Sequence, residues 1–364
     1  METLSGILYH IQRRLLPVLE EELGPLSDLD EQFCKVISLL NLSGLQEHYR
    51  WVGNGCPPHA RVWLFHAFVA KAVYQFPTTG TLINALKNQP RLRRLCGWES
   101  LGAIPSESTF SRAFSAFSRD QWPQAIHEKM VERYAQRRLA VGHISRDSTA
   151  IAVPEKRVPK AKTPPPLPRE RGRPRKGQKR QPEVPKRLDL QLTRTLWENL
   201  TELPRVCNVG CKRNSRGHQE SWIGYKLHLD TIDGDIPISA ILTSASVHDS
   251  QVAIPLAQMS AQRVTSLYDL MDGAYDAPQI RAFSRQLGHI PIIEGNPRKG
   301  VAIPFDPAQA LRFKHRTSSE RVNSSLKQRY GAKWVRVKGA LKVMAHLMFG
   351  VIALTATALF ERLL

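Results

Sequence analysis

Acidic residues and cysteines are both scarce in this sequence, and each shortage restricts the kind of protein it can encode. The 364 residues include 32 Asp and Glu against 52 Lys and Arg, which gives a formal net charge of +20. Such an excess favours binding to a polyanion through counterion release. Five cysteines are an odd number, and no secretory signal is evident, so we expect reduced thiols and a cytoplasmic location rather than a disulfide-stabilised secreted fold. Cys207, Cys211 and His218 lack a fourth ligand at a recognised spacing, so they do not predict zinc.

Long apolar runs are also few, and the run over residues 343–360 near the C-terminus can be interpreted as a membrane helix or as a buried helix. Residues 343–360 carry no formal charge, and a membrane helix has to be considered at that length. The run contains His346, Thr355 and Thr357, has no partner span and closes a strongly basic chain. We therefore expect a buried helix packed against the core sheet, and no membrane.

Half of the excess positive charge is concentrated in residues 154–187. This segment holds 13 basic residues, 3 acidic residues and nine prolines, a composition that predicts an extended insertion without a packed core. Within it, Arg171-Gly172-Arg173-Pro174 resembles the AT-hook, which places guanidinium groups such as those of Arg171 and Arg173 in a narrow A·T minor groove. The alternative is a solvated linker that touches phosphates without sequence preference.

Residues 1–139 have the periodicity of an all-helical region. Apolar positions recur at helical spacing in 33–42, 62–76 and 106–117. The cluster Arg91-Leu92-Arg93-Arg94 suits contacts to a DNA backbone or groove, although an ordinary solvated helix surface explains it equally well.

Two aspartates lie on or at the end of predicted core strands. Asp147 is inside the breaker-free stretch 142–152, and Asp272 ends the stretch 266–272 just before Gly273. Carboxylates in such positions are costly unless they are hydrogen-bonded, paired or bound to metal.

A third carboxylate belongs to a quartet at spacings of three, four and seven residues. In one continuous helix, Phe313, Arg316, Glu320 and Lys327 would project within an arc of roughly 60°. The plain interpretation is an exposed helix with a supporting Arg316–Glu320 pair. If the fold instead gathers Asp147, Asp272 and Glu320, the three charges would repel until hard cations neutralised them, and Mg²⁺ prefers such oxygen ligands.

The chain between the first two acids predicts a hairpin followed by alternating elements. Residues 223–230 and 236–244 are predicted strands joined by an Asp-Gly turn. A helix is expected over 247–262, with Ser246 and Asp249 forming a capping box, so Asp249 is interpreted as a helix cap rather than a fourth site acid. A helix over 277–287 and a strand over 289–294 follow.

These motifs, in this order, resemble the bacterial insertion-sequence transposases of the DDE type. The resemblance is to the branch whose third-acid helix carries Tyr-x2-Arg-x3-Glu-x6-Lys, and Phe313 stands here in place of the tyrosine. It also covers 222–230, 242–250 and 272–276, and extends from about residue 140 to 345.

The resemblance implies a fold and a site. The fold would be an RNase H-like mixed α/β sheet flanked by helices over 140–364, preceded by a helical DNA-binding and dimerisation domain over 1–139. The first acid would lie on the first strand, the second just past the fourth strand, and the third on a later helix. Asp147, Asp272 and Glu320 would hold two Mg²⁺ ions, for which Mn²⁺ can substitute.

It also implies an activity and its partners. The expected activity is cleavage and transfer of DNA strands, acting on terminal inverted repeats and target DNA as a DNA-bound homodimer. Phe313, Arg316 and Lys327 would contact DNA. Two other interpretations remain: a non-catalytic DNA-binding protein derived from a transposase, and an RNase H-like nuclease that cuts without joining.

Overall fold

The N-terminal part of the protein is helical. The computed structural model describes residues 14–53, 55–135, 141–159, 185–213, 217–296 and 304–363. Local sequence explains several helix starts: Ser27 and Thr78 each form a capping box, and Phe110 and Phe117 bury one face of their helix. The helices are α2 (Leu16–Leu23), α3 (Asp28–Leu39), α4 (Ser43–His48), α5 (Arg61–Val73), α6 (Thr79–Asn88), α7 (Pro90–Cys96), η2 (Leu101–Ala103), α8 (Glu107–Arg119) and α9 (Trp122–Ala135). The helical expectation is confirmed for the described residues between 14 and 135.

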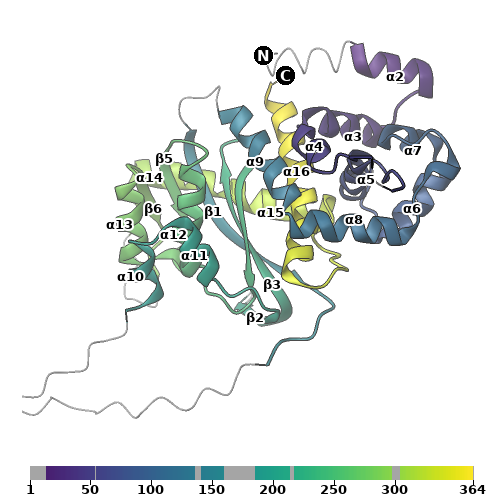
Figure 1. Cartoon of the computed structure of the whole chain (residues 1–364). Coiled ribbons are helices and arrows are strands. Elements are labelled where there is room, and N and C mark those ends of the chain that lie inside the picture. Colours follow the sequence, from purple (N-terminus) through teal and green to yellow (C-terminus); the bar gives the residue numbers. More distant parts are fainter. Residues whose placement is uncertain are drawn as a thin grey trace, which may run out of the picture.

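A mixed sheet forms the centre of the rest of the chain (Figure 1). Its strands are β1 (Val141–Ala152), β2 (Asn208–Arg213), β3 (Gln219–Ile232), β4 (Ile236–Ser244), β5 (Ser266–Met271) and β6 (Ile290–Ile293). The order is β2-β3-β1-β5-β6, and β4 also pairs with β3. Strand β1 runs antiparallel to β3 and parallel to β5, so it lies at the middle of the sheet.

Helices cover both faces of this sheet (Figure 1). One face carries α10 (Arg187–Gln191), α11 (Leu196–Glu202), α12 (Ser250–Ala261) and α13 (Pro278–Gln286). The other carries α15 (Thr317–Arg329) and α16 (Ala340–Leu363). The remaining elements, η3 (Gly273–Tyr275), α14 (Pro307–Phe313) and η5 (Lys314–Arg316), follow β5 or precede α15.

Helix α16 connects the two parts of the molecule. By length and composition this helix could cross a membrane, but 83% of its apolar 18-residue stretch is buried inside the protein. It packs against α3, α5, α8 and α9 on one side and against β4 on the other. The Phe65 and Phe349 rings, 4.9 Å apart, belong to the same buried cluster as Leu229 of β3. The buried helix expected there is confirmed, and the domain boundary at residue 139 stays a prediction.

The predicted hairpin of β3 and β4 is confirmed, with two differences around it. Strand β2 precedes the hairpin and was not predicted, so the second acid follows the fifth strand in chain order rather than the fourth. The capping box at Ser246 and Asp249 was wrong: α12 begins at Ser250, and Asp249 makes no side-chain cap. The Asp249 carboxylate instead forms an ion pair with the partly buried Lys226.

A buried ion pair ties β1 to β3 on the α12 face. Arg146 donates two hydrogen bonds to Asp230, at 2.8 and 2.7 Å, and Ser260 donates a third to the same carboxylate at 2.6 Å. Both charged side chains are almost fully buried. Because successive residues of a strand face opposite sides, the neighbouring Asp147 faces α15.

Candidate active site

Asp147 lies at the centre of the sheet and contacts α15. Its Oδ2 accepts a hydrogen bond of 3.0 Å from Asn323 Nδ2, a residue one turn after Glu320 on the same helix. Strand β1 therefore positions the first acid, and α15 is docked directly against it. The other polar atom of this side chain, Asn323 Oδ1, is buried and finds no hydrogen-bond partner among the described residues.

Asp272 follows immediately after β5, the parallel neighbour of β1. Its Oδ1 accepts from the backbone N–H of Ala274 at 2.9 Å, which caps η3 and fixes the carboxylate at the end of the strand. Nearby Tyr275 has a buried hydroxyl without a partner. The strand-end position predicted for Asp272 is confirmed.

The two aspartates repel each other in a partly dry environment. Burial raises the pKa of Asp147 to about 6, and the charge of Asp272 adds to that rise while Arg316 opposes it. Burial also raises the pKa of Asp272, with contributions from the charges of Asp249 and Glu294. A bound cation would relieve this repulsion.

Arg316 links these aspartates to the third acid. Its guanidinium forms an ion pair with Glu320 and lies close enough to lower the pKa of both Asp147 and Asp272. Glu320 itself is about half exposed. In this structure Arg316 acts as the counter-ion shared among the three carboxylates.

The quartet does not lie on one continuous helix. Phe313 ends α14, residues 314–316 form the 3₁₀ turn η5, and α15 begins at Thr317. Two side-chain hydroxyl groups stabilise this turn by hydrogen bonds to backbone carbonyls. Thr317 donates to the Lys314 carbonyl, and Ser145 of β1 donates to the His315 carbonyl. The Arg316 guanidinium lies 5.7 Å from the centre of the Phe313 ring, so the two side chains still meet.

Asp249 is a fourth carboxylate in this region. It accepts hydrogen bonds of 2.9 Å from Lys226 Nζ and from Ser148 Oγ. Burial alone would raise the pKa of Asp249, but the neighbouring His228 and Lys226 hold it below its usual value. Lys226 therefore neutralises Asp249, which leaves Asp147 and Asp272 as the acids without a dedicated lysine.

The turn between β3 and β4 holds α15 in place. Asp235 accepts from Ser318 Oγ at 2.7 Å and from the Arg321 guanidinium at 2.7 Å. The Asp-Gly signal in the sequence predicts only the hairpin connection and not this contact. Through these contacts Asp235 anchors the start of α15, the helix that carries Glu320 and Asn323.

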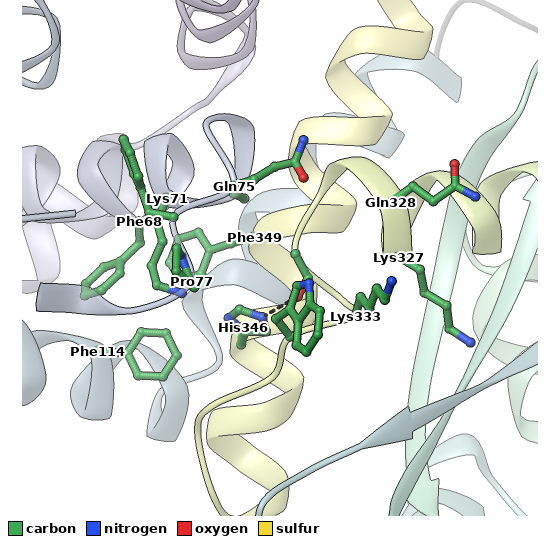
Figure 2. Close-up of a pocket in the computed structure, with 14 residues that line it drawn as sticks. Phe68, Lys71, Gln75, Pro77, Phe114, Lys327, Gln328, Lys333, His346 and Phe349 are labelled. Atoms are coloured by element: carbon green, nitrogen blue, oxygen red, sulfur yellow. Dashed lines mark hydrogen bonds between the residues drawn. The ribbon is translucent and has the colours of Figure 1, made fainter. Parts of the chain in front are cut away.

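Lys327 lies beside a pocket between the N-terminal helices and the end of α15. Figure 2 shows Phe68, Lys71 and Phe114 on one side and Lys327 on the other, with His346 between them. The cavity has a volume of about 250 Å³. Burial and the charge of Lys212 lower the pKa of Lys327.

Lys327 also begins a surface rich in positive charge. Residues 327–342 contain six Lys and Arg and no acid. Arg329, Lys333, Arg336, Lys338 and Lys342 are exposed, and so is Trp334. This run was not predicted, although its six basic residues without an acid are a signal in the sequence.

Other basic residues suggested by the sequence are placed differently. Arg91 pairs with Asp30, Arg94 pairs with Glu99, and Arg93 is buried against backbone carbonyls. Arg93 is thus unavailable to DNA, whereas DNA contact by the partly exposed Arg91 and Arg94 stays a prediction. Arg171 and Arg173 lie outside the described residues.

The donor set at Asp147 and Asp272 fits a hard divalent cation. Its carboxylate oxygens suit Mg²⁺, the repulsion between them favours a cation, and the unpaired Asn323 Oδ1 adds an acceptor beside Asp147. Glu320 is paired with Arg316 in this structure. Within the described part of the chain, the three carboxylates are not gathered as closely as the His143, Asp233 and His315 group, whose ligand atoms lie within 4.8 Å of one another.

Two family models match this chain. A model of the transposase DDE domain matches residues 144–356, and a model of a transposase domain (DUF772) matches residues 21–116. No curated protein and no solved structure matches the chain. The first match spans more than half of the chain, from the strand of the first acid to the helix α16. This chain belongs to the DDE transposase family.

Proposed function

We propose that this protein cleaves and joins DNA strands at the ends of an insertion sequence, in the branch whose third-acid helix carries Tyr-x2-Arg-x3-Glu-x6-Lys. One observation carries the proposal. Asp147 and Asp272, at the middle of the sheet, share Arg316 as a counter-ion with Glu320. In this arrangement two carboxyl groups with raised pKa values lie beside α15, the helix that carries the third acid.

In this proposal Asp147, Asp272 and Glu320 hold two Mg²⁺ ions. Such ions activate the attacking water or 3′-hydroxyl and stabilise the leaving oxygen of an in-line phosphodiester displacement. Asn323 orients the Asp147 carboxylate through its 3.0 Å hydrogen bond. Arg316 exchanges Glu320 for a DNA phosphate, so its positive charge stays at the site while the third acid becomes free to bind metal.

DNA binding rests on the basic surfaces. Lys327 lies half-buried at the start of the basic run 327–342, where it can hold a phosphate near the acids. Arg316 binds a second phosphate, Phe313 packs beside it, and Arg171 and Arg173 add minor-groove contacts. We propose terminal inverted repeats and target DNA as substrates, a homodimer on DNA, and a cytoplasmic location.

Strand joining is the activity that separates this proposal from its alternatives. The assay uses linear DNA carrying the repeats that flank the element, with Mg²⁺, and measures both cut ends and joined products. Asp147→Asn, Asp272→Asn and Glu320→Gln should each abolish both reactions and leave DNA binding nearly unchanged, because binding depends on the basic surfaces. Glu132→Gln, at an exposed position of α9, is the matched control and should remain active.

Each contrary outcome has a clear meaning. Cutting without joining would identify a nuclease, and binding without cutting would identify a non-catalytic DNA-binding protein. Full cleavage by any one of the three acid variants would remove that residue from the site.

A further inference from the structure

A second group of potential ligands lies near the start of β1, whereas Asp147 lies at the middle of that strand. His143 precedes Asp147 by four residues on the same strand face, which corresponds to about 13 Å. It lines a cavity of about 580 Å³ together with Asp233, His315, Ser318 and Arg321. The three potential ligands come from β1, from the turn between β3 and β4, and from η5.

The distances between these ligand atoms suit a transition metal. His143 Nδ1 lies 3.0 Å from Asp233 Oδ1, and His315 Nδ1 lies 3.9 Å from the same oxygen. One ligand atom from each residue falls within 4.8 Å of the others. Ligand atoms bound tetrahedrally to zinc at about 2.0–2.1 Å are about 3.3 Å apart, so the His315 ring would have to rotate out of its parallel stack on His143 to complete the geometry.

Two of the three ligands are already held in position. The second oxygen of Asp233, Oδ2, accepts the backbone N–H of His143 at 3.0 Å, and the His143 ring stacks on Tyr268 at 5.4 Å. His315 stacks on His143 with ring centres 4.4 Å apart and an interplanar angle of 7°. Its side chain is 56% exposed, so it can turn toward a bound ion.

We infer that His143, Asp233 and His315 bind one Zn²⁺-like transition metal ion, separate from the Mg²⁺ ions of the catalytic acids. Two imidazoles and one carboxylate favour zinc or a related ion over Mg²⁺, which prefers oxygen ligands. The open cavity leaves room for a water molecule as the fourth ligand.

A metal at this position would stabilise the segment that carries Arg316. His315 directly precedes Arg316, and its carbonyl accepts a hydrogen bond from Ser145 of β1. Binding would add a second link from η5 to β1 and a link to the β3–β4 turn. The ion would therefore restrict the start of α15 and position Arg316 and Glu320 without contacting the substrate.

The test is a calorimetric titration of the full-length protein with Zn²⁺ in excess Mg²⁺. All variants carry Cys56→Ser and Cys211→Ser, because both thiols are exposed and would bind zinc themselves. We expect one zinc ion per chain. His315→Ala should weaken its affinity at least about tenfold, as the loss of even an outer-shell partner commonly does. Asp233→Asn should weaken it as well.

His48→Ala is the matched control. His48 is also exposed and lies 4.0 Å from the carboxylate of Asp120, but the described residues offer it no second histidine there. This variant should bind zinc with unchanged affinity.

Hydrogen exchange gives an independent readout. In the parent protein, which carries only the two Cys→Ser changes, zinc should slow the exchange of amides 314–320. The same amides of His315→Ala should not respond to zinc. Without zinc, the thermal midpoint of His315→Ala should match that of the parent, because the His315 side chain is largely exposed. A parent protein that does not bind zinc, or a His315→Ala variant that binds it equally well, would overturn the inference.

Discussion

Replacing Asp147 with asparagine should stabilise the fold while abolishing activity, and the effect should depend on pH. A carboxyl whose pKa rises from 3.8 to about 6 on folding carries a penalty of about 3 kcal/mol in its ionised form. Because the native state then holds the proton more tightly than the unfolded state, stability falls as pH rises. The penalty is absent below about pH 4 and complete above about pH 6.

Asparagine has no charge to bury, and its side-chain oxygen can still accept the hydrogen bond from Asn323. In EDTA, we therefore expect Asp147→Asn to exceed the parent in free energy of unfolding by up to about 3 kcal/mol at pH 7. The advantage should disappear near pH 4. Urea unfolding across this range measures the difference, and Mg²⁺ should stabilise the parent more than the variant.

Asp249→Asn is the control with the opposite sign. Its carboxylate has a lowered pKa because His228 and Lys226 outweigh burial, so its ionised form stabilises the fold. This variant should lose stability at pH 7, and the loss should vanish as the pH falls through the pKa of Asp249. The raised pKa of Asp147 would be refuted if the stability difference between Asp147→Asn and the parent did not change with pH. It would also be refuted if that difference favoured the variant less at pH 7 than at pH 4.

Three further predictions follow from specific contacts. Arg146→Met should cost about 3–5 kcal/mol in urea unfolding because it leaves Asp230 buried and unpaired, and adding Asp230→Leu should recover most of the loss. Gly224→Ala should cost about 3 kcal/mol or more in the same assay, because φ is +149° and a Cβ would lie 2.1 Å from the Ile151 carbonyl oxygen. Lys327→Ala should slow strand cleavage at low DNA concentration and recover at high concentration, whereas Glu320→Gln should not recover. Undiminished stability of the first two variants, or a concentration-independent defect in the third, would contradict these assignments.

The sequence predicted the positions of Asp147 and Asp272 because local signals determine them. A breaker-free β-branched stretch around Asp147 and a glycine directly after Asp272 indicate where strands run and end. The hairpin was predictable for the same reason, since an Asp-Gly pair sits between two apolar runs. Strand β2 lacked such a signal and forms by pairing with the start of β3.

Long-range contacts account for what the sequence did not predict. Helical spacing suggested one continuous helix face from Phe313 to Lys327. The Ser145 hydroxyl of β1 instead donates a hydrogen bond to the His315 carbonyl within the 3₁₀ turn η5, which separates α14 from α15. Asp249 matched a capping pattern, but its carboxylate accepts a hydrogen bond from Lys226 of strand β3 and does not cap the helix. The group of His143, Asp233 and His315 has no recognisable spacing, because three separate elements bring it together.

The identity of the third metal ligand is the central claim, and anomalous diffraction from Mn²⁺ tests it most directly. Crystals of the full-length protein with DNA ending at the terminal repeat would be soaked in Mn²⁺, which can replace Mg²⁺. We predict manganese coordinated by Asp147, Asp272 and Glu320, with Arg316 turned to a DNA phosphate. Manganese coordinated by Asp147, Asp272 and Asp249, with Glu320 still paired to Arg316, would contradict the account.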